Sequence, residues 1–130
     1  MAQQDKELLL QYLSMALPYG VKVQQFDNIY AYKLLGIDGD VLHIDCPVYD
    51  DGDGYTEVEY CKPYLRPMSS MTEEEETEYD ILCNYNNNEQ NAIILLGWIL
   101  NKHFDIFGLI PMGLAIEVTE ENNPYKTRKG

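Results

Sequence analysis

The segment Lys62–Glu76 constrains the fold of this 130-residue chain more than any other part, because it joins two kinds of secondary structure. Residues 55–61 before it alternate between two faces, with the period of two that is typical of a strand. Its two prolines are expected to end the sheet, since proline cannot donate a ladder hydrogen bond. Thr72, with Glu75 three residues later, predicts a capping box at the start of an acidic helix. The segment therefore predicts a junction between a β region and a helical region.

The apolar spacing before this junction predicts a single domain of the α+β class that spans residues 1–130. A helix at about residues 5–17, with Asp5 as its cap, is followed by a small sheet of three to five strands at about residues 21–62. We expect antiparallel pairing, because the connections are too short for crossover helices. Asp38-Gly39 predicts a hairpin turn with positive φ at both residues.

Two further helices are predicted after the junction, at about residues 72–84 and 89–103. The second is apolar nearly all round, so we expect it to be the central core helix of the domain. Residues 115–118 have the composition of one further short strand. The last stretch, residues 119–130, is expected to be a frayed tail.

The charge of the chain limits its partners. The formal net charge is −13, from 22 acidic and 9 basic residues, and residues 38–80 contain only Lys62 and Arg66 as bases. Such a surface repels phosphate backbones and anionic lipids, so neither direct nucleic-acid binding nor membrane binding is expected. It attracts basic proteins and speeds their encounter. The simpler interpretation, that acidity only keeps a small protein soluble, stays open.

The cysteines indicate a compartment. Cys46, Cys61 and Cys83 are odd in number, and the chain begins without the basic and then apolar pattern of a secretory leader. Free thiols in a cytoplasmic protein are therefore expected. The longest apolar run, residues 92–100, is far shorter than the roughly 20 residues that a membrane span needs.

No metal and no other cofactor is expected. If Gly54 is placed at position 6 of a calcium loop, Tyr49 and Tyr60 occupy positions 1 and 12, where oxygen ligands are required. His43 and Cys46 are three residues apart, which puts them on opposite faces of a strand, and no second close pair of zinc ligands follows. Neither a Walker loop nor a dinucleotide fingerprint is present.

Our first hypothesis is a non-enzymatic interaction module with an acidic face toward a basic protein partner. Tyr55, Tyr60 and Tyr64 would add rigid contact area beside the charge. One version is an inhibitor that imitates the charge of nucleic acid, which requires the acids to form a continuous stripe. The candidate partner surface consists of Asp50, Asp51, Asp53, Glu57, Glu59, Tyr64, Glu73, Glu74 and Glu76.

Our second hypothesis is a small enzyme in which Cys46, Cys61 or Cys83 acts with a histidine. It requires a thiol within hydrogen-bond reach of His43 or His103 in an open pocket. Each cysteine lies in an apolar or acidic part of the sequence, which raises a thiol pKa and suppresses reactivity. We therefore assign no catalytic residue, and we interpret Lys102 and His103 as cations that oppose a helix dipole. A third alternative is that the sequence does not disclose the function.

Two segments of the chain also carry a resemblance. The run from Lys62 to Glu76, followed by residues 98–105 (WILNKHFD) and 108–110 (GLI), resembles small uncharacterised proteins of gut bacteria, their prophages and mobile elements. The resemblance covers about half the chain, in the same order. It implies a cytoplasmic protein derived from a phage or mobile element. That group has no activity from which the role of any residue could be transferred.

Overall fold

We describe the protein from a computed structural model, in which residues 1–26, 30–45, 53–84 and 89–125 are described. Within these ranges the chain forms three α-helices, three short 3-10 helices and six strands, so the α+β class is confirmed. The elements, in order, are α1 (Gln3–Ala16), η1 (Leu17–Tyr19), β1 (Lys22–Gln25), β2 (Ala31–Asp38), β3 (Val41–Asp45), β4 (Asp53–Glu57), η2 (Val58–Tyr60), β5 (Cys61–Leu65), η3 (Met68–Ser70), α2 (Glu73–Asn84), α3 (Glu89–Asn101) and β6 (Ile116–Glu117).

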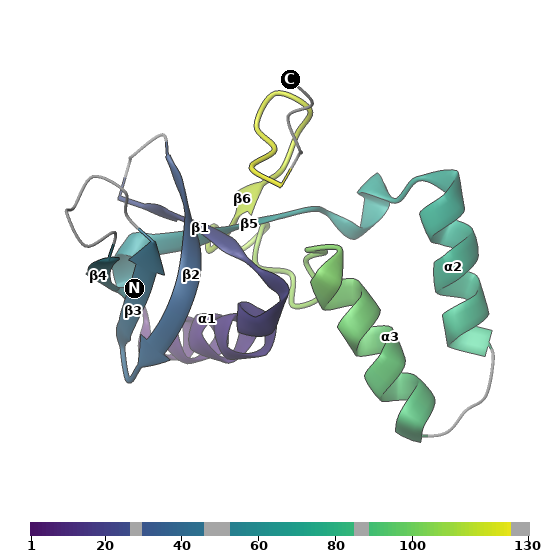
Figure 1. Cartoon of the computed structure of the whole chain (residues 1–130), viewed down its shortest axis with the longest axis horizontal. Helices are drawn as coiled ribbons and strands as arrows, with labels where there is room; N and C mark the ends of the chain where they lie inside the picture. Colours follow the sequence, from purple (N-terminus) through teal and green to yellow (C-terminus); the bar gives the residue numbers. More distant parts are fainter. Residues whose placement is uncertain (27–29, 46–52, 85–88, 126–130) are drawn as a thin grey trace.

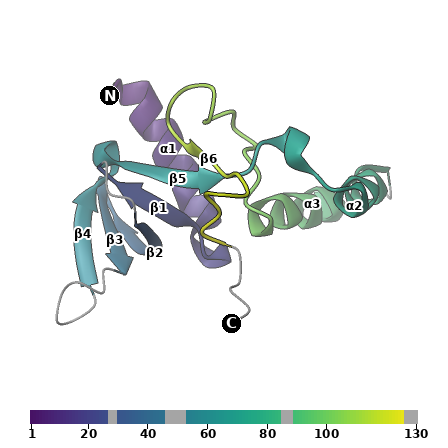
Figure 2. The same ribbon diagram turned by 90° about the horizontal axis from the view of Figure 1, so that it is seen from above.

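The six strands form one sheet in the order β4-β3-β2-β1-β5-β6. All neighbouring pairs are antiparallel except β5 and β6, which are parallel. Figure 2 shows that the sheet twists strongly, so that β1 and β5 cross the direction of β2, β3 and β4. The short helix η2 joins β4 to β5 across this twist, and its Tyr60 carbonyl accepts a 2.8 Å hydrogen bond from the Phe26 amide at the end of β1. The β region is therefore a curled, partly open meander.

The sheet is larger than the sequence predicted. We expected three to five strands ending near residue 62, but β5 continues to Leu65 and β6 adds a sixth strand. Pro63 lies inside β5 opposite Val23 of β1, whereas β6 pairs only with Tyr64 and Leu65. No described strand adjoins the other side of Pro63, and a residue without an N–H is tolerated on such an open side. The short strand expected at residues 115–118 is confirmed as β6.

The hairpin predicted at Asp38-Gly39 is confirmed, with a shift of one residue. Asp38 pairs with Val41, so the two-residue turn consists of Gly39 and Asp40. Gly39 has a φ of 61°, and Asp40 is not among the described residues with positive φ. A single positive φ at the first central position matches a type II′ turn rather than the expected type I′ turn.

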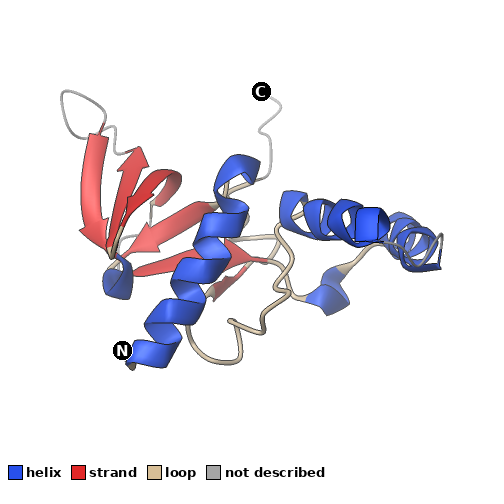
Figure 3. Cartoon of the chain, turned by 90° about the horizontal axis from the view of Figure 1, so that it is seen from below, coloured by secondary structure: helices blue, strands red, loops and turns tan. Residues whose placement is uncertain are grey.

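Helix α1 covers one face of the sheet, as Figure 3 shows from below. Its sequence spaces buried side chains three and four residues apart, which gives the helix one apolar stripe. The helix begins earlier than predicted, and Ala2 rather than Asp5 is the residue at its N-cap. Asp5 lies in the first turn, where its charge favours the helix dipole. The core between α1 and the sheet includes Leu9, Tyr12, Leu13, Ala16, Val21, Val23, Leu34, Leu42, Ile44 and Leu65.

Helices α2 and α3 form an antiparallel hairpin that stands away from the sheet (Figure 1). The indole Nε1 of Trp98 donates a 2.8 Å hydrogen bond to the Glu78 carboxylate, and the Asn91 side chain donates to the Leu82 carbonyl. Only the end of α3 is buried in the body, at Ile99 and Leu100. The prediction that this helix is the central core helix is therefore wrong, since α1 occupies that place.

Arg66, immediately after β5, connects the sheet to the start of α2 and to the residues that follow α3. Its guanidinium forms two hydrogen bonds to the Glu75 carboxylate, of 2.9 and 2.7 Å, and lies 4.4 Å from the centre of the Phe104 ring. Its backbone accepts from Asp105 and donates to His103, both at 2.8 Å. Glu75 also completes the predicted capping box, because its carboxylate accepts from the Thr72 amide while the Thr72 hydroxyl accepts from the Glu75 amide. This Arg66 junction sets where the hairpin leaves the body.

The C-terminal segment is tied to the sheet as far as Tyr125. We expected residues 119–130 to be frayed, and residues 119–125 of this stretch are described. The Tyr125 hydroxyl accepts a 2.9 Å hydrogen bond from the Lys22 amide and donates one of 2.8 Å to the Tyr64 carbonyl. Its ring stacks on His103 with the centroids 3.6 Å apart. One side chain thus contacts β1, β5 and the end of α3.

We predict that Glu75→Gln makes the protein less stable at neutral pH and less sensitive to acid. The Arg66 guanidinium beside Glu75 lowers the pKa of this carboxyl from 4.5 to about 2. The stabilisation is therefore complete above pH 4.5 and is lost as the pH falls from 4.5 toward 2, up to about 3 kcal/mol. Urea unfolding between pH 7 and pH 2 should show a smaller loss with acid in the variant. Glu76→Gln, at an exposed position of the same helix, should keep the wild-type pH profile.

We predict that Tyr125→Phe lowers the free energy of unfolding by about 1–2 kcal/mol, because it leaves the Lys22 amide and the Tyr64 carbonyl without this partner. Urea denaturation followed by tryptophan fluorescence measures the change. Tyr55→Phe is the matched control, because the Tyr55 ring is exposed and loss of its hydroxyl should change stability by less than about 0.5 kcal/mol. Equal effects of the two substitutions would show that Tyr125 does not hold the tail.

Candidate functional site

The residues of the predicted partner surface lie in two separate places. Glu57 ends β4 and Glu59 lies in η2, and both side chains are exposed. The other exposed acids, Glu73, Glu74 and Glu76, lie in the first turn of α2. Figure 1 places β4 and α2 at opposite ends of the molecule. The described acids therefore do not form the single continuous stripe that a nucleic-acid mimic requires.

For four other residues of that surface, the side chain is either buried or outside the described part of the structure. Asp50 and Asp51 lie outside the described residues, and Asp53 is described only through its backbone at the start of β4. Tyr64 is buried in β5 with 3% of its surface exposed, so its ring belongs to the interior. Tyr55 and Tyr60, which we expected to accompany the charge, are both exposed.

One candidate contact surface is the outer part of the α2–α3 hairpin. Ile93 and Ile94 of α3 are 70% and 56% exposed, and Ile81 of α2 is 56% exposed. All three lie toward the turn end of the hairpin, because the Asn91 side chain bonds the Leu82 carbonyl across the helices. We call Ile81, Ile93, Ile94 and the exposed acids of α2 the hairpin surface. A group of large exposed apolar side chains with polar neighbours is typical of a contact surface.

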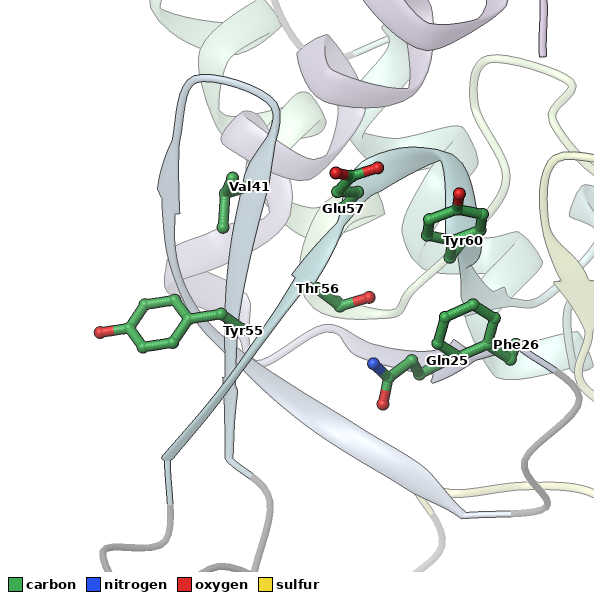
Figure 4. Close-up of a pocket in the computed structure, with 7 residues that line it drawn as sticks. All are labelled: Gln25, Phe26, Val41, Tyr55, Thr56, Glu57 and Tyr60. Carbon is green, nitrogen blue, oxygen red and sulfur yellow. The ribbon is translucent and has the colours of Figure 1, made fainter.

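A second surface is a groove of about 400 Å³ on the open side of β4. We call it the seam groove, because it separates β4 from the end of β1 in the curled sheet. Figure 4 shows Gln25 and Thr56 in its middle, Glu57 on its rim and the Phe26 and Tyr60 rings together on one side, while Tyr55 points away from them. The complete lining is Gln25, Phe26, Val41, Tyr55, Thr56, Glu57 and Tyr60.

Two aromatic rings form a wall of the seam groove. Phe26 is 59% exposed and Tyr60 46% exposed, and their rings stack with centroids 4.8 Å apart. Phe26 has a φ of 53°, which is rare for a bulky residue and costs about 1–2 kcal/mol. Its amide hydrogen bond to Tyr60 holds this conformation, and strain of this kind collects at functional sites. Sequence reasoning missed this conformation, because phenylalanine is not a residue type that favours positive φ.

Two carboxyl groups lie together at the rim of this groove. The pKa of Glu57 is raised, because its carboxyl shares a hydrogen bond with Glu59 and feels the charge of that neighbour. Lys6 is close enough to offset part of this repulsion, but its ammonium already pairs with Asp40 at 2.9 Å. A cation placed beside Glu57 and Glu59 would remove the repulsion between them.

The described cysteines do not form the arrangement that a thiol enzyme needs. Cys61 is buried in β5, and burial raises the pKa of its thiol to about 11. Cys83 is exposed on α2, where its neighbour is Tyr79 rather than a histidine. Cys46 lies outside the described residues. Nothing in the described geometry supplies an activated thiolate.

His103 has a structural position that differs from the expected one. It follows α3 with a φ of 62°, and the Phe104 amide bonds the Ile99 carbonyl, which together form a Schellman cap. Burial, with the charges of Arg66 and Lys22, lowers the pKa of His103 to about 4. The imidazole is therefore neutral at pH 7, and the expectation that it opposes the helix dipole as a cation is wrong.

Comparisons with known proteins give no match from which a function could be assigned. The chain matches no family model, no curated protein and no solved structure. Among the described residues, no helix combines the length and apolar character that crossing a membrane requires. The same residues contain no group of three or more histidine, cysteine or acidic side chains placed to hold a metal ion.

We predict that the two described thiols differ strongly in reactivity. In a Cys46→Ser background at pH 8, a disulfide reagent such as dithionitrobenzoate should modify Cys83 within minutes and Cys61 only at the rate of unfolding, because Cys61 is buried and protonated. Cys83→Ser and Cys61→Ser variants assign the two phases. Fast reaction of Cys61 in the folded protein would contradict its burial and revive the thiol-enzyme hypothesis.

Proposed function

We propose that this chain is a non-enzymatic interaction module that uses the hairpin surface to bind a basic protein. A cytoplasmic setting and an origin in a phage or mobile element belong to the same proposal. The sequence resemblance supports both, and the odd number of cysteines supports the cytoplasmic setting. The observation that carries the proposal is the exposure of Ile81, Ile93 and Ile94 in a hairpin whose first helix also carries exposed acids. The partner segment that fits this surface is an amphipathic helix with a basic edge.

The apolar part of the surface supplies the affinity. A solvated isoleucine costs free energy that burial recovers, at about 25 cal/mol for each Å² removed from water. Ile93 and Ile94 are adjacent on α3, and both side chains are more than half exposed. A partner helix that covers them would bury both side chains at once, in the way that an amphipathic helix fills an apolar groove.

The charge of the hairpin favours a basic partner over a second copy of the chain. Neither α2 nor α3 contains a lysine or arginine, and Glu73, Glu74 and Glu76 are exposed along one helix. Two such hairpins brought together would place like charges near one another, which opposes association. A partner helix that lies along the hairpin, with lysine or arginine toward the first turn of α2, would meet opposite charge there.

We predict that a synthetic amphipathic helix of leucine and lysine binds the protein at this surface, with an affinity that falls as salt rises. Isothermal titration calorimetry should show at least tenfold weaker binding to the Ile93→Ser, Ile94→Ser double variant, since two buried apolar side chains are lost. The triple variant Glu73→Gln, Glu74→Gln, Glu76→Gln should bind more weakly and with a smaller salt dependence.

The control for the charge variant is Glu117→Gln, Glu120→Gln, Glu121→Gln, which removes three exposed acids away from the hairpin. It has the same net charge as the α2 variant, so equal weakening in both would reduce the binding to non-specific attraction and overturn the proposal. Analytical ultracentrifugation tests whether a second copy of the chain occupies this surface instead. A wild-type dimer that the double isoleucine variant converts to a monomer would show that a second copy covers this surface.

A further inference from the structure

The seam groove lies along a strand edge that pairs with no other described strand. β4 pairs with β3 on one side, and it is the last strand in the order of the described sheet. An edge strand directs the N–H and C=O groups of every second residue outward, where they can pair with another extended chain. β4 spans five residues, or about 16 Å at 3.3 Å for each residue, which is the length of one short added strand. The described groove therefore offers backbone partners as well as side chains.

The two sides of the groove suit one kind of side chain. Phe26 and Tyr60 present aromatic rings that are about half exposed, and an exposed ring face attracts a cation. Glu57 lines the same groove and stands on its rim beside Glu59. A lysine or arginine side chain between the rings and Glu57 would gain both contacts. A phosphate would meet the two carboxylates and be repelled.

We propose that the seam groove binds an extended, basic segment of a partner protein, which adds to the free edge of β4 as a strand and places a lysine or arginine side chain between Phe26 and Glu57. This surface is separate from the hairpin surface, so the two proposals stand or fall independently. Main-chain hydrogen bonds supply affinity in such β-addition, and the alternate side chains supply selectivity.

The probe is an acetylated and amidated heptapeptide in which valine and arginine alternate. Chemical shifts of ¹⁵N-labelled protein report its position, and the expected perturbations lie on β4, Phe26 and Tyr60. Phe26→Ala and Glu57→Gln should each weaken binding about tenfold, and Glu57→Gln should also lower its salt dependence. The Ile93→Ser, Ile94→Ser variant of the hairpin surface should bind the peptide like wild type. A thermal melt of each variant shows whether it is folded. If Phe26→Ala does not fold, the result for Glu57→Gln alone decides the test.

A second peptide tests the strand geometry. Methylation of alternate backbone amides, so that one edge of the peptide cannot donate, should abolish binding when it blocks the edge that faces β4. Methylation of the opposite amides should leave binding unchanged. Equal binding of both methylated peptides would overturn the added strand, and shifts that gather on α2 and α3 instead of β4 would overturn the site.

Discussion

The pairing of Arg66 with Glu75 is the interaction on which the arrangement of the molecule depends. The guanidinium reaches the first turn of α2, while the Arg66 backbone pairs with the residues that follow α3. One residue at the end of β5 therefore fixes both the start of α2 and the end of α3. A two-point contact between guanidinium and carboxylate sets orientation as well as distance, which the point charge of a lysine cannot do. The Phe104 ring beneath the guanidinium removes water from one side of the pair and strengthens it.

This junction explains why a strongly apolar helix is left outside the core. Arg66 and Phe104 hold the end of α3 against the body, and Ile99 and Leu100 are buried there. The contact continues at Gly97, where a Cβ atom would come within 3.0 Å of the Tyr19 hydroxyl. From Gly97 back to its start, α3 packs mainly against α2, and a single neighbouring helix covers only one side of it. The apolar residues near the start of α3 therefore remain exposed for a reason that lies at its other end.

Features that depend on residues close together in the sequence were predicted, whereas features that depend on distant residues were missed. The capping box of Thr72 and Glu75, the hairpin near Gly39 and the stripe of α1 depend on residues a few positions apart, and each was predicted. The burial of Tyr64 and the place of Pro63 inside a strand depend on β1 and β6, which are distant in the chain, and both were missed. Composition alone cannot tell a core helix from one half of an exposed hairpin. The Phe26 conformation depends on its hydrogen bond to Tyr60, so no local pattern discloses it.

The acids of α2 argue against charge that serves solubility alone. Negative charge in the first turn stabilises a helix through its dipole, and Glu75 is neutralised by Arg66. Asp80 lies beyond that turn and is exposed, four residues after Glu76, and like charges at this spacing cost about 0.2–0.5 kcal/mol. Neither helix of the hairpin offers a cation in return. Solubility could be supplied by acids at any exposed position, whereas Glu73, Glu74 and Glu76 gather in the first turn of the helix that also carries the exposed Ile81. A basic partner that covers the isoleucines would relieve the charge repulsion and the apolar exposure in a single contact, which is why we place the first binding surface here.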